Sequence, residues 1–183
     1  MSRDSGSLPA EWAAFLHDLD LLLPEPVRLV CIGGFALRVM YRIPRITADI
    51  DCISILPFHD LEEIAGCESP LAKKYKVHLQ YVAVTSMPLN YEDRVTELFP
   101  RRFKKLRIYV PDAYDLILSK VERNSPKDRE DVQYLAKTAQ LNPTVLRERY
   151  EKELRPFLAN EVRHDLTIKL WSELFPPASA NRS

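Results

Sequence analysis

The chain has 183 residues, of which 46% are hydrophobic, and its 26 Lys and Arg balance 26 Asp and Glu to a formal net charge of +0. This composition excludes disorder as the default state and suffices for one compact domain, while the balanced charge weakens a nucleic-acid role without excluding a local basic patch. No segment approaches the roughly 18 apolar residues of a membrane span, and the short polar N-terminus lacks a signal-peptide core, so we expect a soluble cytoplasmic protein with no membrane partner.

The first part of the chain alternates short helices and strands. Apolar periodicity defines the segments, and prolines and glycines end them, because proline lacks the N–H that a helix interior needs. In chain order we predict helix 8–23, strand 27–32, helix 35–41, strand 49–56, helix 59–65, strand 76–84 and strand 106–110. Strict alternation in 76–84 puts Val77, Leu79, Tyr81 and Ala83 on one face and His78 and Gln80 on the other.

The remainder of the chain is predicted to be helical. The expected helices are 112–123, 126–139, 143–158 and 161–174, the second of them starting at a Ser125 cap followed by proline. Strands early and helices late predict an α+β class, a mixed sheet with flanking helices and a C-terminal helical cluster. We expect a core over 1–110, a helical region over 111–175 packed on it as a single compact unit, and a flexible tail over 176–183.

Two of the four glycines, Gly33 and Gly34, are adjacent at a predicted strand-to-helix junction. Glycine there permits positive φ and lets another group approach the backbone, and the following helix N-terminus suits a phosphate. A structural tight turn is the alternative explanation.

Two carboxylates, Asp49 and Asp51, open the predicted strand 49–56. A strand places residues i and i+2 on one face, and two like charges so close favour a cation between them. Hard oxygen ligands of this kind suit Mg²⁺. Alternatively, both are solvated strand-end residues, and Arg45 and Thr47 before them are ordinary loop residues.

Taken together, Gly33-Gly34-x-Ala36-Leu37 and Arg45-x-Thr47-x-Asp49-x-Asp51 resemble the nucleotidyltransferase superfamily that includes DNA polymerase β. The chain looks closest to a small bacterial branch related to the AbiEii-type toxin nucleotidyltransferases. The resemblance covers roughly residues 28–136, since it extends to Asp115-Leu116-Ile117-Leu118-Ser119-Lys120, Arg123 and Lys127-Asp128-x-x-Asp131-Val132. The fold that it implies agrees with the periodicity.

The resemblance implies transfer of a nucleoside monophosphate (NMP) from a nucleoside triphosphate (NTP) to an RNA, protein or small-molecule acceptor. Asp49 and Asp51 would be catalytic and would hold Mg²⁺ or Mn²⁺. Lys120 would neutralise phosphate charge, with a surface lysine as the alternative, and Asp131 would act as a base or hold Lys120. The nucleotide-binding set would be Gly33, Gly34, Arg45 and Thr47. Asp128 lies in a first helical turn, where a structural role is favoured.

One departure weakens the expectation of activity. Many superfamily members supply a third carboxylate from a later strand, where this chain has His78 and Gln80 on the solvent face. Three alternatives follow: the site works with two carboxylates plus Asp131, the enzyme has weakened activity, or it has lost catalysis. The alternative function is therefore a catalytically silent module of the same fold that binds a nucleotide or a partner.

Other features leave alternatives open. The basic run 101–105 is either an exposed loop or a contact for an RNA acceptor, and a toxin-like role would bring an antitoxin partner. Leu166, Leu170, Trp171 and Leu174 pack in the core or against a partner, with core favoured. Three cysteines without CxxC spacing predict buried thiols, and His17, His59 and His164 are expected on solvated helical faces.

Overall fold

The computed structural model describes residues 8–44, 47–57, 61–83 and 85–175. The chain forms two compact units, one made of Met1–Val84 and Val95–Pro111, the other of Thr85–Arg94 and Asp112–Ser183. The chain therefore passes between the units three times, because residues 85–94 belong with the C-terminal part. The boundary after residue 110 and the packing of the helical region on the core stay predictions. The tail 176–183 lies outside the described residues.

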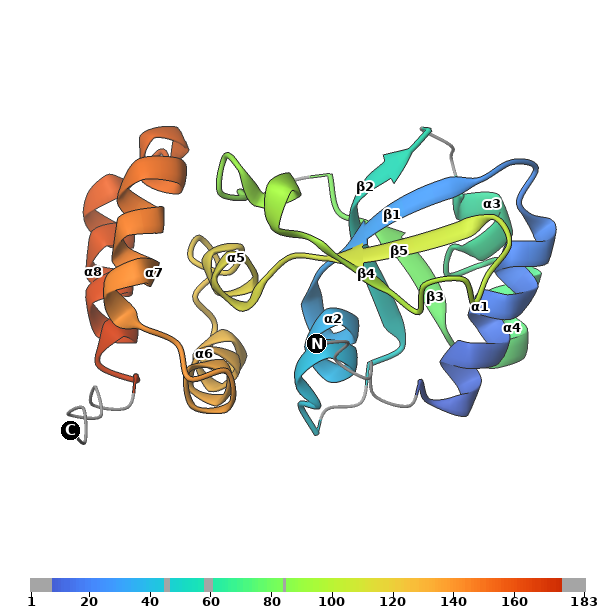
Figure 1. The fold of residues 1–183 in the computed structure, drawn as a ribbon, viewed down its shortest axis with the longest axis horizontal. Helices are drawn as coiled ribbons and strands as arrows, with labels where there is room; N and C mark the ends of the chain where they lie inside the picture. Colours follow the sequence, from blue (N-terminus) through green and yellow to red (C-terminus); the bar gives the residue numbers. More distant parts are fainter. Residues whose placement is uncertain (1–7, 45–46, 58–60, 84, 176–183) are drawn as a thin grey trace. The chain divides into compact units, whose positions relative to one another are not determined.

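The first unit contains a mixed sheet of five strands in the order β3-β2-β1-β5-β4. The strands are β1 (Val27–Cys31), β2 (Asp49–Leu56), β3 (His78–Tyr81), β4 (Thr96–Leu98) and β5 (Leu106–Val110). The central strand β1 runs antiparallel to β2 and parallel to β5; β3 runs parallel to β2, and β4 antiparallel to β5. Figure 1 shows the five arrows as one twisted sheet. The predicted α+β class with a mixed sheet is confirmed.

Four helices complete the first unit: α1 (Ala10–Leu22), α2 (Gly33–Tyr41), α3 (Glu62–Ala65) and α4 (Pro70–Tyr75). α1, α3 and α4 pack against one another. The rings of Trp12 on α1 and Phe35 on α2 lie 5.0 Å apart, so aromatic packing joins these two helices. The sequence reasoning missed α4, a six-residue helix that starts at a Ser69 cap with proline at its first position.

A buried carboxylate fixes α1 to the start of β5. Asp20 is only 6% exposed and accepts hydrogen bonds from the backbone N–H groups of Lys104 (2.9 Å), Lys105 (2.7 Å) and Leu106 (2.7 Å). Burial alone would raise the pKa of Asp20, but the three donors together hold it below 3.8. The ionised carboxylate therefore anchors the loop that leads into β5.

One predicted strand differs from the structure, and one strand of the sheet was not predicted. β3 ends at Tyr81 rather than at residue 84, and the Tyr81 side chain is 46% exposed instead of sharing the buried face of Val77 and Leu79. β4 was not predicted, because it has only three residues and Phe99 after it takes a positive φ of 52°.

The second unit contains α5 (Ala113–Leu118), α6 (Pro126–Thr138), α7 (Pro143–Arg149) and α8 (Glu161–Ser172). Shorter turns are the 3₁₀ helices η1 (Tyr91–Arg94) and η3 (Arg155–Phe157) and the π-helix η2 (Tyr150–Leu154). The predicted helical cluster is confirmed, and Ser125 caps α6 as predicted. The single helix predicted over 143–158 is wrong, since the chain changes to the π-helix η2 and then to the 3₁₀ helix η3, which contains Pro156, a residue without an N–H to donate. Among the described residues, no helix has the length and apolar character needed to cross a bilayer.

Two predictions about α8 are wrong. His164 is 3% exposed rather than solvated, because α8 packs against α6 and α7. Leu166 and Leu170 are 57% and 50% exposed and do not belong to the core, whereas Trp171 does at 1%.

Candidate active site

The glycine pair lies at the junction between β1 and α2. Ile32 has an extended conformation and forms the N-cap of α2, and Gly33 follows with a φ of 65°. A Cβ on Gly33 would overlap Oδ2 of Asp51, and one on Gly34 would lie 3.0 Å from Cγ2 of Thr47. Gly33 therefore satisfies two requirements, a left-handed backbone and room for a carboxylate.

The antiparallel pairing of β1 and β2 brings the carboxylates to this junction. Cys31 at the end of β1 is paired with Cys52 near the start of β2, and the N–H of Ile32 donates to the carbonyl of Asp51 at 2.9 Å. The side chain of Asp51 then packs against Gly33 at the positive end of α2, where the helix dipole favours a negative charge.

Asp49 and Thr47 complete this group. Asp49 is the first residue of β2 and its side chain is 46% exposed. Its backbone N–H donates to Oγ1 of Thr47 at 3.3 Å, so Thr47 contacts both the start of the strand and Gly34. The structure thus brings together Gly33, Gly34, Thr47, Asp49 and Asp51, whereas Arg45 lies outside the described residues.

The neighbouring strand β3 lies alongside the two carboxylates. Its register with β2 pairs His78 with Asp49 and Gln80 with Asp51. Nε2 of His78 is 3.4 Å from Oδ1 of Asp49. Sequence reasoning put His78 and Gln80 on one face but missed this register, because the pairing of two strands depends on the fold between them.

The donor set fits a magnesium ion. Asp49 and Asp51 offer hard carboxylate oxygens two residues apart on one strand, and Mg²⁺ commonly uses one or two carboxylates and completes its shell with phosphate oxygens and water. No cluster of three or more His, Cys, Asp or Glu within the described part of the chain is arranged to hold a metal. The described residues therefore do not form a metal site from protein side chains alone.

Two thiols belong to the paired residues Cys31 of β1 and Cys52 of β2. Cys31 and Cys52 are fully buried, and their Sγ atoms are 3.2 Å apart. The hydrogen bond between them and then burial raise the pKa of the Cys52 thiol. Both cysteines are free and buried, as predicted, whereas the third cysteine, Cys67, is exposed.

Lys120 and Asp131 belong to the second unit, where they form a buried charged cluster. Lys120 is 5% exposed, and its Nζ lies 3.0 Å from Oδ2 of Asp131 and 3.3 Å from Oδ1 of Asp128. Buried charges need such partners. The alternative of a surface lysine is wrong, and the contact by which Asp131 holds Lys120 is present.

Asp128 has a structural role at the start of α6. It forms a capping box with Ser125 and receives a hydrogen bond from Nε of Arg123 at 2.8 Å. Although burial would raise the pKa of Asp128, Arg123 and Ser125 hold it well below its usual range. The ionised form of Asp128 therefore stabilises the helix start and pairs with Lys120.

A second charged network in this unit was missed by sequence reasoning. Asp115 is fully buried and contacts Arg94 at 2.9 Å and Arg149 at 3.0 Å. Arg94 also pairs with Glu153 at 2.7 Å. Burial raises the pKa of Asp115 despite both guanidinium groups. No pattern in the sequence links Arg94 to a helix that begins after residue 112.

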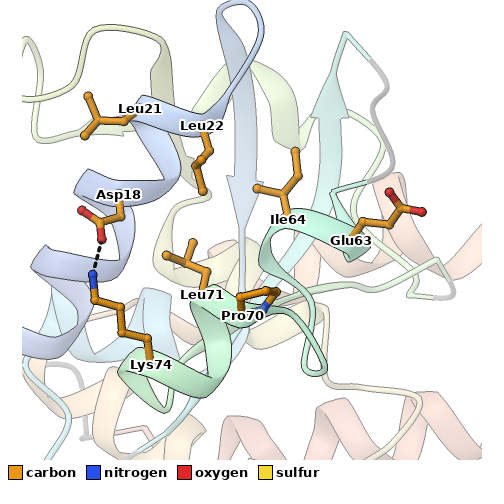
Figure 2. A pocket seen from close by; sticks show the side chains of 8 residues that line it. All are labelled: Asp18, Leu21, Leu22, Glu63, Ile64, Pro70, Leu71 and Lys74. Atoms are coloured by element: carbon orange, nitrogen blue, oxygen red, sulfur yellow. Dashed lines mark hydrogen bonds and ion pairs between the residues drawn. The ribbon is translucent and has the colours of Figure 1, made fainter.

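The first unit also contains an apolar cavity of about 650 Å³ between α1, α3 and α4. Figure 2 shows its apolar walls, with the Asp18–Lys74 ion pair of 2.9 Å at one edge. Its lining residues are Asp18, Leu21, Leu22, Glu63, Ile64, Pro70, Leu71 and Lys74. None of the predicted site residues lines this cavity, so the chemistry predicted from the sequence does not depend on it.

Comparison with known protein families identifies a match. A model of the family described as "Nucleotidyltransferase of unknown function (DUF6036)" matches residues 14–175. No curated protein and no solved structure matches the chain. The matched span starts within α1 and ends just after α8, so it includes the glycine junction, the two carboxylates and the Lys120 cluster.

Proposed function

Since the chain belongs to this nucleotidyltransferase family, we propose that it transfers an NMP group from an NTP to an acceptor in a metal-dependent reaction. An acceptor oxygen would attack the α-phosphorus, the bond from that phosphorus to the oxygen bridging to the β-phosphate would break, and pyrophosphate would leave. The observation that carries the proposal is the packing of Asp51 on Gly33 at the N-terminus of α2, with Asp49 two residues earlier on the same strand.

In this proposal the chain's own residues hold and orient the reactants. Asp49 and Asp51 are the residues that would bind Mg²⁺ or Mn²⁺. When bound, the ion would supply charge neutralisation to the phosphates and favour ionisation of the acceptor hydroxyl. The α2 N-terminus stabilises the ionised form of Asp51, which is the form that binds a metal. Thr47 fixes the first residue of β2 by accepting from the Asp49 N–H.

The test is label transfer by the full chain, with NTPs labelled at the α- or the γ-phosphate. NMP transfer leaves α-label on the acceptor and sends γ-label to pyrophosphate, whereas phosphoryl transfer leaves γ-label on the acceptor and keeps α-label in the nucleoside diphosphate. We expect Asp49→Asn and Asp51→Asn each to lower α-label transfer at least 100-fold, about 3 kcal/mol of lost transition-state stabilisation. Glu68→Gln is the matched control, because the Glu68 side chain is 86% exposed in the same unit. Transfer indifferent to both Asp substitutions contradicts the proposal.

The second candidate function is a catalytically silent module that binds a nucleotide or a partner. The observation that favours it is the register of β3, which sets His78 and Gln80, rather than an acid, beside the two carboxylates. Under this alternative, NTPs raise the melting temperature of wild type and of Asp49→Asn alike, and no acceptor becomes labelled. If NTPs raise the melting temperature of wild type but not of Asp49→Asn, and an acceptor becomes labelled, the results support an active transferase.

For an RNA acceptor, the exposed basic groups of the loop before β5 are Arg101, Arg102 and Lys104. Lys105 donates to a backbone carbonyl after α1, and Arg107 pairs with a carboxylate of β4. Replacing the three exposed residues with glutamine should weaken RNA binding. It should also reduce the slope of log affinity against log salt concentration by the equivalent of about three phosphate contacts. Wild-type binding that does not change between 50 and about 200 mM salt removes RNA as the acceptor. A toxin-like role with an antitoxin partner likewise stays a proposal.

A further inference from the structure

His78 is the side chain that the sheet sets beside Asp49. In the parallel pairing of β2 and β3, His78 is the residue opposite Asp49, and paired residues on neighbouring strands project to the same face. The imidazole is 24% exposed, and Nε2 lies 3.4 Å from Oδ1 of Asp49. Asp49 itself is at the strand's first position and about half exposed. Its carboxylate would otherwise be free to change rotamer.

The backbone of His78 is held firmly. Its N–H donates to the carbonyl of Ala48 at 3.0 Å, immediately before Asp49. Val77 on its N-terminal side is 4% exposed and anchors the start of β3 in the core. Lys76 ends α4 with a φ of 58°, so the chain turns sharply from helix to strand at this point. The imidazole therefore projects from a fixed position.

The contact suits a role in orienting the carboxylate. With a proton on Nε2, in one neutral tautomer and in the charged form, His78 would attract Oδ1 of Asp49 across the 3.4 Å contact and leave Oδ2 to bind the metal. Carboxylates that bind metals are themselves commonly held by neighbouring polar groups, and losing such a neighbour costs about 10- to 100-fold in metal affinity. Asp51 packs against Gly33, so the two carboxylates contact different residues.

We infer that His78 is a positioning residue that fixes the Asp49 carboxylate for metal binding, from the register that pairs the two residues and the 3.4 Å contact between them. The inference rests on the proposed function, because it takes Asp49 and Asp51 as the metal-binding pair. His78 acts through Asp49 rather than as a third ligand, in agreement with the lack of a three-residue metal cluster among the described residues.

The experiment titrates Mn²⁺ into the full chain without nucleotide and follows binding by calorimetry and electron paramagnetic resonance. His78→Ala should weaken Mn²⁺ binding about 10-fold, and His78→Gln, which keeps an amide donor at the same end of the side chain, should recover part of the affinity. His17→Ala is the matched control. His17 also lies 3.3 Å from a carboxylate, that of Asp18, but its side chain is 66% exposed on α1. Melting temperatures of all variants establish that each remains folded.

The inference is overturned by an affinity of His78→Ala within twofold of wild type, by equal losses in His78→Ala and His17→Ala, or by nitrogen coupling to bound Mn²⁺ that disappears in His78→Ala. The last result would make His78 a direct ligand. Wild type that binds no Mn²⁺ also overturns it. The label-transfer assay keeps the two proposals apart, since turnover with unchanged Mn²⁺ affinity in His78→Ala leaves the transferase standing and removes only the role of His78.

Discussion

At the scale of single residues, Gly33 gives the sharpest prediction. Gly33→Ala places an L-residue at a φ of 65° and its Cβ on Oδ2 of Asp51, so both the backbone and the carboxylate must shift. We expect a loss of about 1–3 kcal/mol in the free energy of unfolding, measured by urea denaturation, together with a loss of metal binding. Gly34→Ala is the control, because Gly34 does not have a positive φ and its Cβ would meet the side chain of Thr47, with Cγ2 at 3.0 Å, rather than a carboxylate. Equal stability of the two variants would contradict the role assigned to Gly33.

The sequence identified these residues but not their contacts. Gly33-Gly34 and Asp49-x-Asp51 were recognisable from spacing, since strand periodicity alone puts both carboxylates on one face. The contact between Gly33 and Asp51 depends on the pairing of β1 with β2, whose register shifts between Val30 and Cys31. Local patterns carry no information on such a shift. The burial of His164 was missed for the same reason, because it depends on which helices pack on α8.

At the scale of elements, Asp20 joins α1 to the start of β5. Asp20→Ala removes the acceptor of three N–H groups, one in a buried and two in partly buried hydrogen bonds, and we expect a loss of about 3 kcal/mol in the free energy of unfolding at pH 7. Glu11→Gln, at an exposed position of the same helix, should change it by less than about 0.5 kcal/mol.

The same carboxylate has a defined effect of pH on stability. The pKa of Asp20 in the folded chain lies below its ordinary value of 3.8, so its contribution is present above that pH and is lost as pH falls through the folded value. The difference between wild type and Asp20→Ala in urea denaturation should therefore be constant from pH 7 to about pH 5 and narrow only below 3.8. A difference that grows on acidification would be inconsistent with this anchor.

Element boundaries show where sequence reasoning reaches its limit. The apolar patterns of β1, β2 and β5 predicted these strands, because each has at least five residues and several buried positions. β4 has three residues and α4 has six, too few for a period to repeat. The helix over 143–158 was predicted from its apolar spacing in spite of Pro156, although a proline at that position excludes a continuous α-helix.

At the scale of the whole molecule, the segment 85–94 belongs to the second unit although it lies within the sequence of the first. From this segment, Arg94 contacts the fully buried Asp115 at 2.9 Å. Arg94→Ala should cost about 3 kcal/mol in the free energy of unfolding, since it leaves Asp115 with one fewer cation in a buried site. Arg107→Ala breaks an exposed pair with Glu97 of similar length, 3.1 Å, and should cost at most about 1 kcal/mol. Thermal and urea denaturation of both variants test the difference.

The order of the sheet has a consequence for synthesis on the ribosome. β1 lies at the centre, and its two neighbours are β2, which follows closely in the chain, and β5, which begins only at residue 106. As the chain emerges, β1, α2 and β2 can bring Gly33 and Asp51 together early, while the other edge of β1 has no strand to pair with. The backbone groups that Asp20 holds, at residues 104–106, arrive at the same late moment. The nascent chain therefore carries the open edge of an apolar central strand until β5 leaves the ribosome, and this interval is when it is most prone to aggregate.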